Sequence, residues 1–247
     1  MKNKKRLDVF IYGLYPKYSR RQIQSWIMQG KVKVDDKVVT KSGTQVAPEV
    51  KIDLDIQEPK YVSRAGFKLE RALDNFKIDV TGLTVLDAGI STGGFTDCLL
   101  QRGAKKIYGI DVGYGQVHEK VAHDDRVLVI ERTNLRNSAE VLQKVPQKVD
   151  LVTLDLSFIS ILKVMDTVVA VLKDGGQLIT LIKPQFEAER KDVGKGGIVK
   201  DAKVHKKVID NVTKGIQAYG FELVGWTESP IFGATGNKEF LAYFKKV

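Results

Sequence analysis

Cysteine is nearly absent from this sequence. Cys98 is the single cysteine among 247 residues, so no disulfide can form within the chain. It lies in the apolar run 97–100 of a predicted helix, which favours a small core residue. Histidine is scarce too, because only three are present and none has a partner at metal-ligand spacing. These shortages exclude a disulfide framework, and we expect no metal site.

Long apolar runs are missing as well. No segment approaches the ~20 residues that a membrane helix needs. The first ten residues, MKNKKRLDVF, begin with basic side chains but carry no apolar stretch of signal-peptide length. The sequence therefore predicts a cytoplasmic protein that works without a membrane partner.

Positive charge is what the sequence has in excess. Its formal net charge is +10, with 40 Lys and Arg against 30 Asp and Glu. Residues 1–41 hold 11 of these bases and three acids, a net of +8, which leaves +2 for the remaining 206 residues. Charge gathered in one segment indicates a polyanionic partner, nucleic acid before an anionic membrane. Plain surface solubility is the alternative.

The basic segment has the pattern of a small α+β domain. Apolar residues at helical spacing cover 7–14, and Pro16 ends this helix. Ser19 is placed to cap a second helix. Residues 1–58 are expected to form the domain and 59–62 a linker. Alternating residues predict its strands near 31–34, 38–39 and 51–56.

Beyond the linker, strands alternate with helices. Ser63 is placed to cap a helix that runs to Phe76. Alternation predicts an α/β domain over 63–247, with a seven-stranded, mostly parallel sheet covered on both faces. The loop between the last two strands is short, so at least one of them should run antiparallel. Strands are expected near 84–89, 106–111, 127–132, 150–157, 176–183, 222–229 and 239–246. Helices are expected near 94–101, 116–122, 138–144, 161–172 and 201–218.

A glycine-rich turn follows the first strand of this domain. The strand 84–89 runs directly into ISTGGF, residues 90–95, which opens a helix. Glycines allow a ligand to approach the backbone closely, and a helix N-terminus offers free N–H groups. The spacing of Gly89, Gly93 and Gly94 differs from the GxGxxG of dinucleotide folds, and no P-loop lysine follows. The turn therefore argues against a dinucleotide-binding fold and excludes a P-loop.

Polar residues end the next two strands at the same predicted edge. Asp111 lies 22 residues past Gly89, where an acid reaches a ribose diol in doubly wound folds. Asn134 follows the third strand and is placed to meet an adenine. The alternative for Asp111 is a cap of the next helix. Together these features favour S-adenosylmethionine, and the predicted cofactor-binding residues are Asp87, Gly89, Ser91, Thr92, Gly93, Gly94, Phe95, Asp111, Asn134 and Asp155.

Two further strands bring a carboxylate and a lysine to that edge. The fourth strand ends in Asp155, within LDLSF, and the fifth ends in Lys183, within IKPQFE. Lysine is almost never fully buried without a partner, so a lysine at the end of a buried strand is a site candidate. We expect Asp155 and Lys183 to meet above the cofactor.

These segments, taken in order, resemble a known family. YVSRAGFKL, LDAGISTGGF, IDVG, ERTN, LDLSFIS, IKPQFE, GKGGIVKD and GNKEF are similar to the TlyA-like, or hemolysin A-like, branch of the FtsJ/RrmJ methyltransferases. The N-terminal unit is similar to the alpha-L RNA-binding motif of a small-subunit ribosomal protein and of pseudouridine synthases. The resemblance spans essentially the whole chain. It implies a Rossmann-like class I methyltransferase domain preceded by an RNA-binding domain.

The resemblance also implies a reaction. Its members use S-adenosylmethionine to methylate a ribose 2′-hydroxyl, which implies a cytidine of ribosomal RNA or of ribosomal subunits as the target here. The family's Lys-Asp-Lys-Glu set matches Lys68, Asp155, Lys183 and Glu239, with Lys183 taking or attracting the hydroxyl proton. The alternative is that Lys68 and Lys183 only grip RNA phosphates.

Basic side chains predict where RNA binds. Arg20 and Arg21 lie opposite the apolar face of the second helix, and lysines flank them. Arg64 and Arg71 would extend this surface along the first helix of the larger domain. A rigid basic surface suits recognition of RNA by shape and phosphate contact, whereas a merely solvated helix face is the alternative. The predicted RNA-binding residues are Lys17, Arg20, Arg21, Lys31, Lys33, Arg64 and Arg71.

Other functions stay open at this point. An inactive fold would serve as an RNA chaperone or ribosome-assembly factor, and the family's historical label suggests a membrane-acting hemolysin. Enzymes that methylate base amines commonly carry Asp/Asn-Pro-Pro-Tyr/Phe after the fourth strand, whereas residues 155–158 here are Asp-Leu-Ser-Phe. Residues 187–200 contain three glycines and predict a mobile loop that orders on binding, with an ordinary surface excursion as the alternative.

We predict that binding to ribosomal RNA weakens steeply with salt, because each phosphate contact releases condensed counterions. Equilibrium binding of a ribosomal RNA fragment at ~50 and ~200 mM salt measures the effect, and six or more phosphate contacts correspond to a loss of roughly 10³-fold. An affinity that stays flat across this range would contradict the basic-surface assignment.

Overall fold

The computed structural model describes residues 4–56 and 59–247, which form two compact units, one up to Pro59 and one from Lys60. The smaller unit has helices α1 (Leu7–Leu14) and α2 (Arg20–Met28). Its antiparallel sheet has the strand order β3-β2-β5. Two further strands of two residues each, β1 and β4, pair with one another in antiparallel. Their bounds are β1 Lys5–Arg6, β2 Val32–Val34, β3 Lys37–Val38, β4 Gln45–Val46 and β5 Ile52–Leu54.

Local sequence signals place these elements. Ser19 caps α2 as predicted: its Oγ accepts from the Gln22 N–H, and the Gln22 side chain accepts from the Ser19 N–H. Asp35 and Asp36 turn the chain with positive φ angles of 48° and 64°. The three predicted strands are confirmed: β2 and β5 are shorter than predicted, and β3 is shifted by one residue, whereas β1 and β4 were not predicted. The core consists of Leu7, Ile11, Ile23, Ile27, Val32 and Val46.

A buried carboxylate joins the two helices of this unit. Asp8 is fully buried, and its oxygens accept from Arg6 Nε at 3.0 Å, from an Arg20 Nη at 3.1 Å and from Gln24 Nε2 at 2.7 Å. The hydrogen bond from Arg6 is the largest cause that holds the Asp8 pKa well below its usual range. One acid thus fixes two guanidinium groups that come from different elements.

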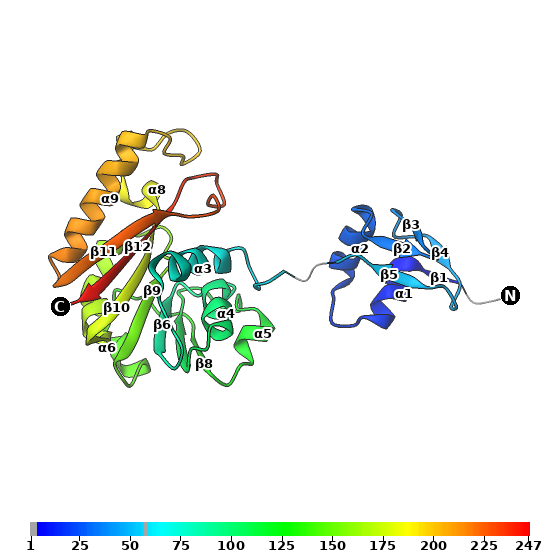
Figure 1. The fold of residues 1–247 in the computed structure, drawn as a ribbon, viewed down its shortest axis with the longest axis horizontal. Coiled ribbons are helices and arrows are strands. Elements are labelled where there is room, and N and C mark those ends of the chain that lie inside the picture. Colours follow the sequence, from blue (N-terminus) through cyan, green and yellow to red (C-terminus); the bar gives the residue numbers. More distant parts are fainter. Residues whose placement is uncertain (1–3, 57–58) are drawn as a thin grey trace. The chain divides into compact units, whose positions relative to one another are not determined.

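The larger unit is built on a seven-stranded sheet of order β11-β12-β10-β9-β6-β7-β8 (Figure 1). The five strands from β10 to β8 run parallel, and β12 runs antiparallel to both of its neighbours. The predicted α/β class and the antiparallel strand are therefore confirmed. The strands are β6 Thr84–Ala88, β7 Lys106–Ile110, β8 Val127–Ile130, β9 Val149–Leu154, β10 Leu172–Ile182, β11 Phe221–Glu228 and β12 Phe240–Lys246.

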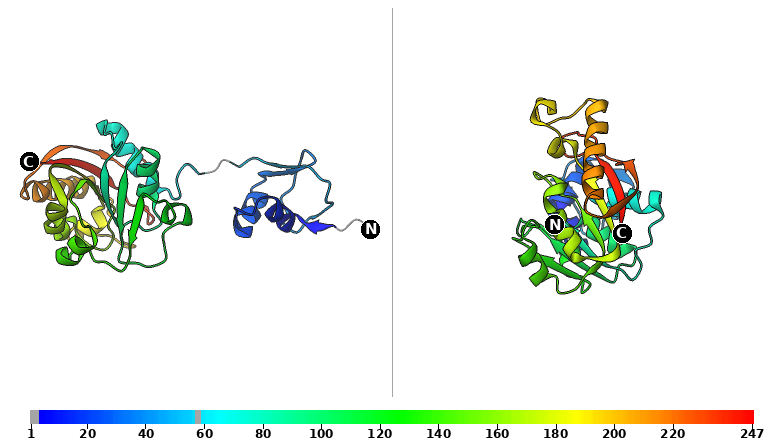
Figure 2. Two further views of the ribbon diagram at one scale, coloured as in Figure 1. Left: turned by 90° about the horizontal axis from the view of Figure 1, so that it is seen from below. Right: turned by 90° about the vertical axis from the view of Figure 1, so that its left-hand side faces the viewer.

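Helices cover both faces of this sheet (Figure 2). Successive residues of a strand point to opposite faces, so Val85 joins the core under α3 and α4, whereas Leu86 joins the core under α7 and α9. None of the helices in the described ranges is long and apolar enough to cross a bilayer. The helices are α3 Ala65–Phe76, α4 Gly94–Gln101, α5 Glu119–Ala122, α6 Ser138–Lys144, α7 Met165–Val171, α8 Pro184–Glu187 and α9 Ala202–Gln217.

Two predicted helix starts are wrong. Ser63 does not cap α3, which begins at Ala65; its buried Oγ has no hydrogen-bond partner among the described residues, because it packs tightly against the start of α4. The helix expected from residue 116 begins at Glu119, where the His118 ring accepts from the Lys120 N–H. His118 therefore fills the capping position that was the alternative role for Asp111.

We predict that Asp8→Ala lowers the free energy of unfolding of the N-terminal unit by roughly 1–3 kcal/mol, because the hydrogen bonds that Arg6, Arg20 and Gln24 donate to this buried carboxylate are lost. The chain has two tryptophans, Trp26 and Trp226, so urea unfolding followed by fluorescence in a Trp226→Phe background reports this unit alone. Asp53→Ala is the matched control, since Asp53 forms an exposed pair with Lys51 and has an ordinary backbone conformation. Equal losses in both variants would contradict the buried-acid account.

Candidate active site

The turn after β6 is shaped by close packing against the end of β9. Gly89 has a φ of +85°, and a Cβ there would lie 2.5 Å from the Asp155 carbonyl oxygen, so only glycine fits. Ser91 continues the turn with a positive φ of 48°. Its N–H donates to Asp111 Oδ2 at 2.8 Å, which ties the turn to the end of β7. Three strand ends thereby meet at one edge of the sheet.

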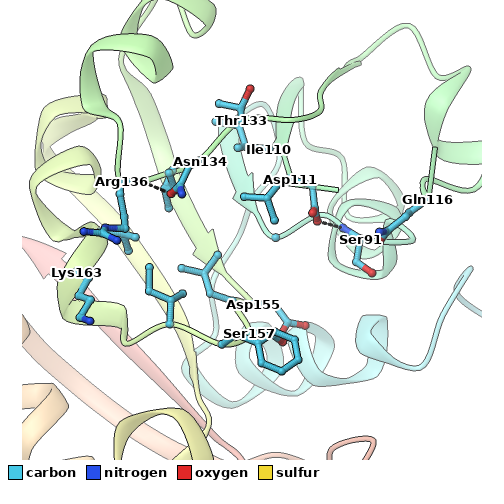
Figure 3. Close-up of a pocket in the computed structure, with 17 residues that line it drawn as sticks. Ser91, Ile110, Asp111, Gln116, Thr133, Asn134, Arg136, Asp155, Ser157 and Lys163 are labelled. Atoms are coloured by element: carbon cyan, nitrogen blue, oxygen red, sulfur yellow. Dashed lines mark hydrogen bonds between the residues drawn. The ribbon is translucent and has the colours of Figure 1, made fainter. Parts of the chain in front are cut away.

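A cavity of about 580 Å³ opens at this edge (Figure 3). Ser91 and Asp111 form one side, and Asn134 lies on the other side, where its Oδ1 accepts from the Arg136 N–H at 3.0 Å. We call this the donor cavity, because it lies where the sequence predicts that the methyl donor, S-adenosylmethionine, binds. Apolar side chains complete its wall: Ile110, Val112, Leu135, Leu156, Ile159 and Val164.

The ten residues predicted to bind a cofactor divide into two groups. Five line the donor cavity: Gly89, Ser91, Asp111, Asn134 and Asp155. The other five do not line it: Thr92 is exposed, whereas four are buried, namely Asp87, Gly93, Gly94 and Phe95. Gly94 is there for helix packing, because a Cβ on it would lie 2.2 Å from Ser63 Oγ.

Asp87 is a fully buried acid directly beneath the turn. Its two oxygens accept from the hydroxyl groups of Thr96, at 2.6 Å, and Thr153, at 2.8 Å. Burial raises its pKa to about 6, and these two hydrogen bonds oppose the rise. Asp87 therefore joins β6 to α4 and β9 from behind the cavity wall.

A second cavity, of about 440 Å³, contains all four residues of the predicted Lys-Asp-Lys-Glu set. Lys183 Nζ lies 2.7 Å from Asp155 Oδ1, and Lys68 Nζ lies 2.5 Å from Glu239 Oε2. Both lysines are 8% exposed and Glu239 is 4% exposed, so the charges are paired in a largely buried setting. We call this the acceptor cavity, because its four charged residues are the set predicted to act on the methyl acceptor, a ribose hydroxyl.

Sequence reasoning missed one partner of Lys183. Ser157 accepts a hydrogen bond of 2.9 Å from Lys183 Nζ, so two neighbours hold the ammonium group. The serine belongs to LDLSF, two residues after Asp155, but its type alone gave no signal. Ser157 also lies where the two cavities meet: Gly89, Ser91, Asp155, Ser157 and Phe158 line both of them.

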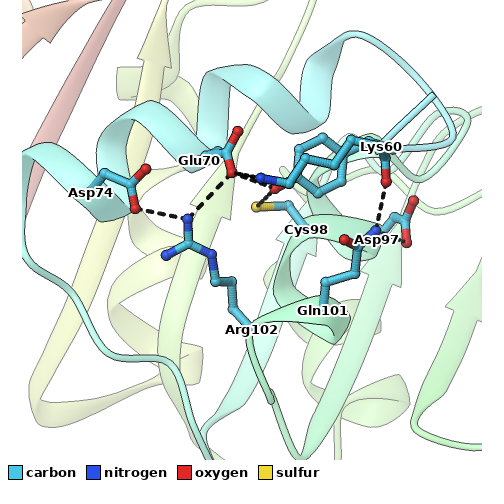
Figure 4. A network of polar contacts seen from close by, with 8 residues as sticks. Lys60, Glu70, Asp74, Asp97, Cys98, Gln101 and Arg102 are labelled. Carbon is cyan, nitrogen blue, oxygen red and sulfur yellow. Dashed lines mark hydrogen bonds and ion pairs between the residues drawn. The ribbon is translucent and has the colours of Figure 1, made fainter. Parts of the chain in front are cut away.

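Polar contacts lock α3, which carries Lys68, against α4 (Figure 4). Tyr61 is buried; its hydroxyl donates to Glu70 of α3 at 2.9 Å and lies 3.6 Å from the Cys98 thiol of α4. The Val62 N–H donates to Asp97 at 2.8 Å. Cys98 is fully buried, which confirms the predicted core residue, and this burial raises its pKa to about 11. Residues 60–62, predicted as a linker, thus contact both helices.

The predicted RNA-binding residues lie on the surface of their units. Arg20 is half-exposed and held by Asp8. Arg64, directly before α3, and Arg71 on α3 are exposed, whereas Lys68 between them points inward to Glu239. The remaining members are exposed on the N-terminal unit: Lys17, Arg21, Lys31 and Lys33.

The fold and the paired cavities define a Rossmann-like methyltransferase. Residues 61–246 match the FtsJ-like methyltransferase family, and the chain belongs to that family. Residues 5–52 match the S4 domain, which agrees with the predicted RNA-binding unit.

Relatives cover nearly the whole chain. Hemolysin A of Brachyspira hyodysenteriae is 43% identical over 97% of this chain and 99% of its own length. The 16S/23S rRNA (cytidine-2′-O)-methyltransferase TlyA of Mycobacterium tuberculosis is 39% identical over 92% of this chain and 84% of its own length. A solved structure from Streptococcus thermophilus, described as a candidate hemolysin, has 37% identity and a TM-score of 0.73, covering 100% of this chain and 90% of that one.

We predict that the stability of Asp87→Asn relative to the parent increases as the pH rises from about 4 to above 6. The Asp87 pKa is about 6 in the folded chain and 3.8 in a model peptide, so ionisation above pH 6 disfavours the folded state. The gain is on the order of 2–3 kcal/mol at most. Urea unfolding at several pH values measures it.

Asp79→Asn is a control of opposite sign, because a hydrogen bond from Thr81 lowers the Asp79 pKa. Asp79→Asn should be less stable than the parent at neutral pH, and this difference in stability should vanish in acid. A difference between Asp87→Asn and the parent that does not vary with pH would show that Asp87 is not titrating as expected.

Proposed function

We propose that this protein transfers the methyl group of S-adenosylmethionine to a ribose 2′-hydroxyl of ribosomal RNA, with cytidine as the target nucleoside. The observation that carries the proposal is the common wall of the two cavities, where Asp155 and Ser157 face both. A donor on one side and an acceptor on the other would react across that wall.

The donor cavity has the chemistry that an adenosyl sulfonium needs. Asp111 already accepts two backbone N–H groups, from Ser91 and Gly113, but each carboxylate oxygen has a second lone pair for a ribose hydroxyl. Ile110 and Leu135 offer an apolar surface to the adenine. When bound, S-adenosylmethionine would supply a methyl group on a positively charged sulfur.

The acceptor cavity supplies the groups that the hydroxyl needs. In the proposed reaction S-adenosylmethionine would supply the methyl group to the ribose 2′-oxygen. The Asp155 carboxylate would take the hydroxyl proton, and the Lys183 ammonium group beside it would attract the 2′-oxygen. Ser157 and Asp155 hold Lys183 so that its ammonium group faces the reacting oxygen. Glu239 neutralises Lys68 and fixes it as the second contact to the nucleotide.

The target is inferred from the S4 domain and from the relatives. An RNA-binding unit that precedes a methyltransferase unit supports an RNA substrate, and the TlyA relative is named for cytidine 2′-O-methylation of 16S and 23S rRNA. Ribosomal RNA or ribosomal subunits are therefore the proposed partners, and the cytoplasm the proposed location. The basic surface residues are proposed to bind the RNA backbone: Lys17, Arg20, Arg21, Lys31, Lys33, Arg64 and Arg71.

The alternatives have less support. A chain that only binds RNA has no need of two buried ion pairs facing a cavity, since such pairs are costly to desolvate. The membrane-acting alternative rests on the name of a relative.

We predict that Lys183→Ala lowers the rate of methyl transfer to ribosomal RNA by at least about a hundredfold, because the ammonium group that attracts the 2′-oxygen is lost. Transfer of labelled methyl groups to rRNA measures the rate, and mass spectrometry of nucleosides identifies 2′-O-methylcytidine. Calorimetry should find S-adenosylmethionine binding retained.

Lys173→Ala is the matched control, because Lys173 lies on the same strand but at its exposed end, paired with Asp150. It should methylate at the parental rate. Full activity of Lys183→Ala would remove the catalytic assignment, and a methylated base in place of a methylated ribose would change the proposed reaction.

A further inference from the structure

Asn237 lies at the junction of two loops that border the acceptor cavity. It is fully buried, and it precedes Glu239 by two residues in the segment that joins β11 to β12. Its Oδ1 accepts from the Val199 N–H at 2.9 Å, and its Nδ2 donates to the Gly197 carbonyl at 2.8 Å and to Thr235 Oγ1 at 3.0 Å. Both N–H groups and the oxygen of the amide are therefore used.

The loop that Asn237 holds, residues 194–199, follows α8 and leads to α9. It closes on itself, because the Gly197 N–H donates to the Gly194 carbonyl at 3.0 Å and the Gly194 N–H to the Ile198 carbonyl at 3.0 Å. Val199 is buried, and its carbonyl lies 2.9 Å from His205 Nε2 on α9. Figure 1 draws this loop and the β11–β12 loop at the same end of the sheet.

These two loops form one wall of the acceptor cavity. Gly196 and Gly197 come from the first loop and Ala234 and Thr235 from the second, and the paired charges of Lys183 and Lys68 line the same cavity. Glycine and alanine have no long side chains with which to fix their own place. The position of this wall is therefore set by the backbone anchors, and Asn237 is the anchor that the two loops have in common.

The amide group is suited to this task. The Gly197 carbonyl and the Val199 N–H both face the Asn237 side chain, so this side chain must both donate and accept hydrogen bonds. A carboxylate would meet the Gly197 carbonyl with a second acceptor, and an alanine would leave the Val199 N–H and the Gly197 carbonyl unsatisfied in a buried place. Either change disfavours the present arrangement of the loop.

We propose that Asn237 is a positioning residue, which holds the glycine loop 194–199 as a wall of the acceptor cavity and thereby sets where the reacting ribose lies against Lys183. The inference rests on the proposed function. Asn237 acts through the loop backbone and not on the reacting atoms. It sits behind the wall that faces the RNA, while the donor cavity is lined by other segments.

The test compares Asn237→Ala and Asn237→Asp with the parent enzyme on ribosomal RNA. We expect kcat to fall tenfold to a hundredfold, because a small misplacement of the reacting group slows a reaction that depends on alignment. KM for RNA and the affinity for S-adenosylmethionine, measured by calorimetry, should stay within about twofold of the parent. Trypsin should cut the folded variants faster at Lys195, which is exposed on this loop, and at Lys200, which is exposed directly after it.

Asn75→Ala, at an exposed asparagine of α3, is the control and should match the parent in every readout. If Asn237→Ala fails to fold, Asn237→Asp still tests the idea, because it keeps the acceptor for the Val199 N–H and loses only the two donors. Parental kcat and parental trypsin resistance in the variants would overturn the inference. A loss of affinity for S-adenosylmethionine as large as the fall in kcat would overturn it too. A parent enzyme that methylates no RNA would remove the proposed function, and the inference with it.

Discussion

Two buried lysines, each paired with a carboxylate, set the geometry of this active edge. An unpaired charge in such a setting would carry a large desolvation cost, so each lysine holds its partner close. The Lys183–Asp155 pair joins the ends of β10 and β9, and the Lys68–Glu239 pair joins α3 to the residue before β12. Four elements that are distant in the sequence therefore converge on one cavity, and the charge balance of the site is also what holds its walls in place.

Sheet topology explains why two cavities meet at this point. The chain moves outward from β6 to β7 and β8 in one direction, and then returns to lay down β9 and β10 on the other side of β6. Such a reversal leaves a crevice at the carboxyl ends of the two central strands. Gly89 follows β6 and Asp155 follows β9, so the common wall of the donor and acceptor cavities lies at this reversal.

Features with a local signal could be predicted from the sequence. Lys183 and Asp155 were identifiable because each ends an apolar strand, and parallel strands end at one edge. The β1–β4 pair was not, since two residues give no periodicity. Ser63 has the residue type of a helix cap, but packing against α4 decides where α3 begins. Asn237 and Asp87 bind partners up to 40 and 66 residues away, and no local pattern encodes such contacts.

The place of β12 has a consequence for how the enzyme is made. This strand is late in the sequence yet lies inside the sheet, hydrogen-bonded to β10 on one side and β11 on the other. During translation the parallel strands can associate early, but the gap beside β10 stays open until residues 240–246 have left the ribosome. Glu239, just before that strand, follows all five parallel strands in the chain, so Lys68 lacks this counterion until the segment before β12 is in place. A nascent chain therefore passes through a stage in which the donor side is assembled while the acceptor side is still incomplete.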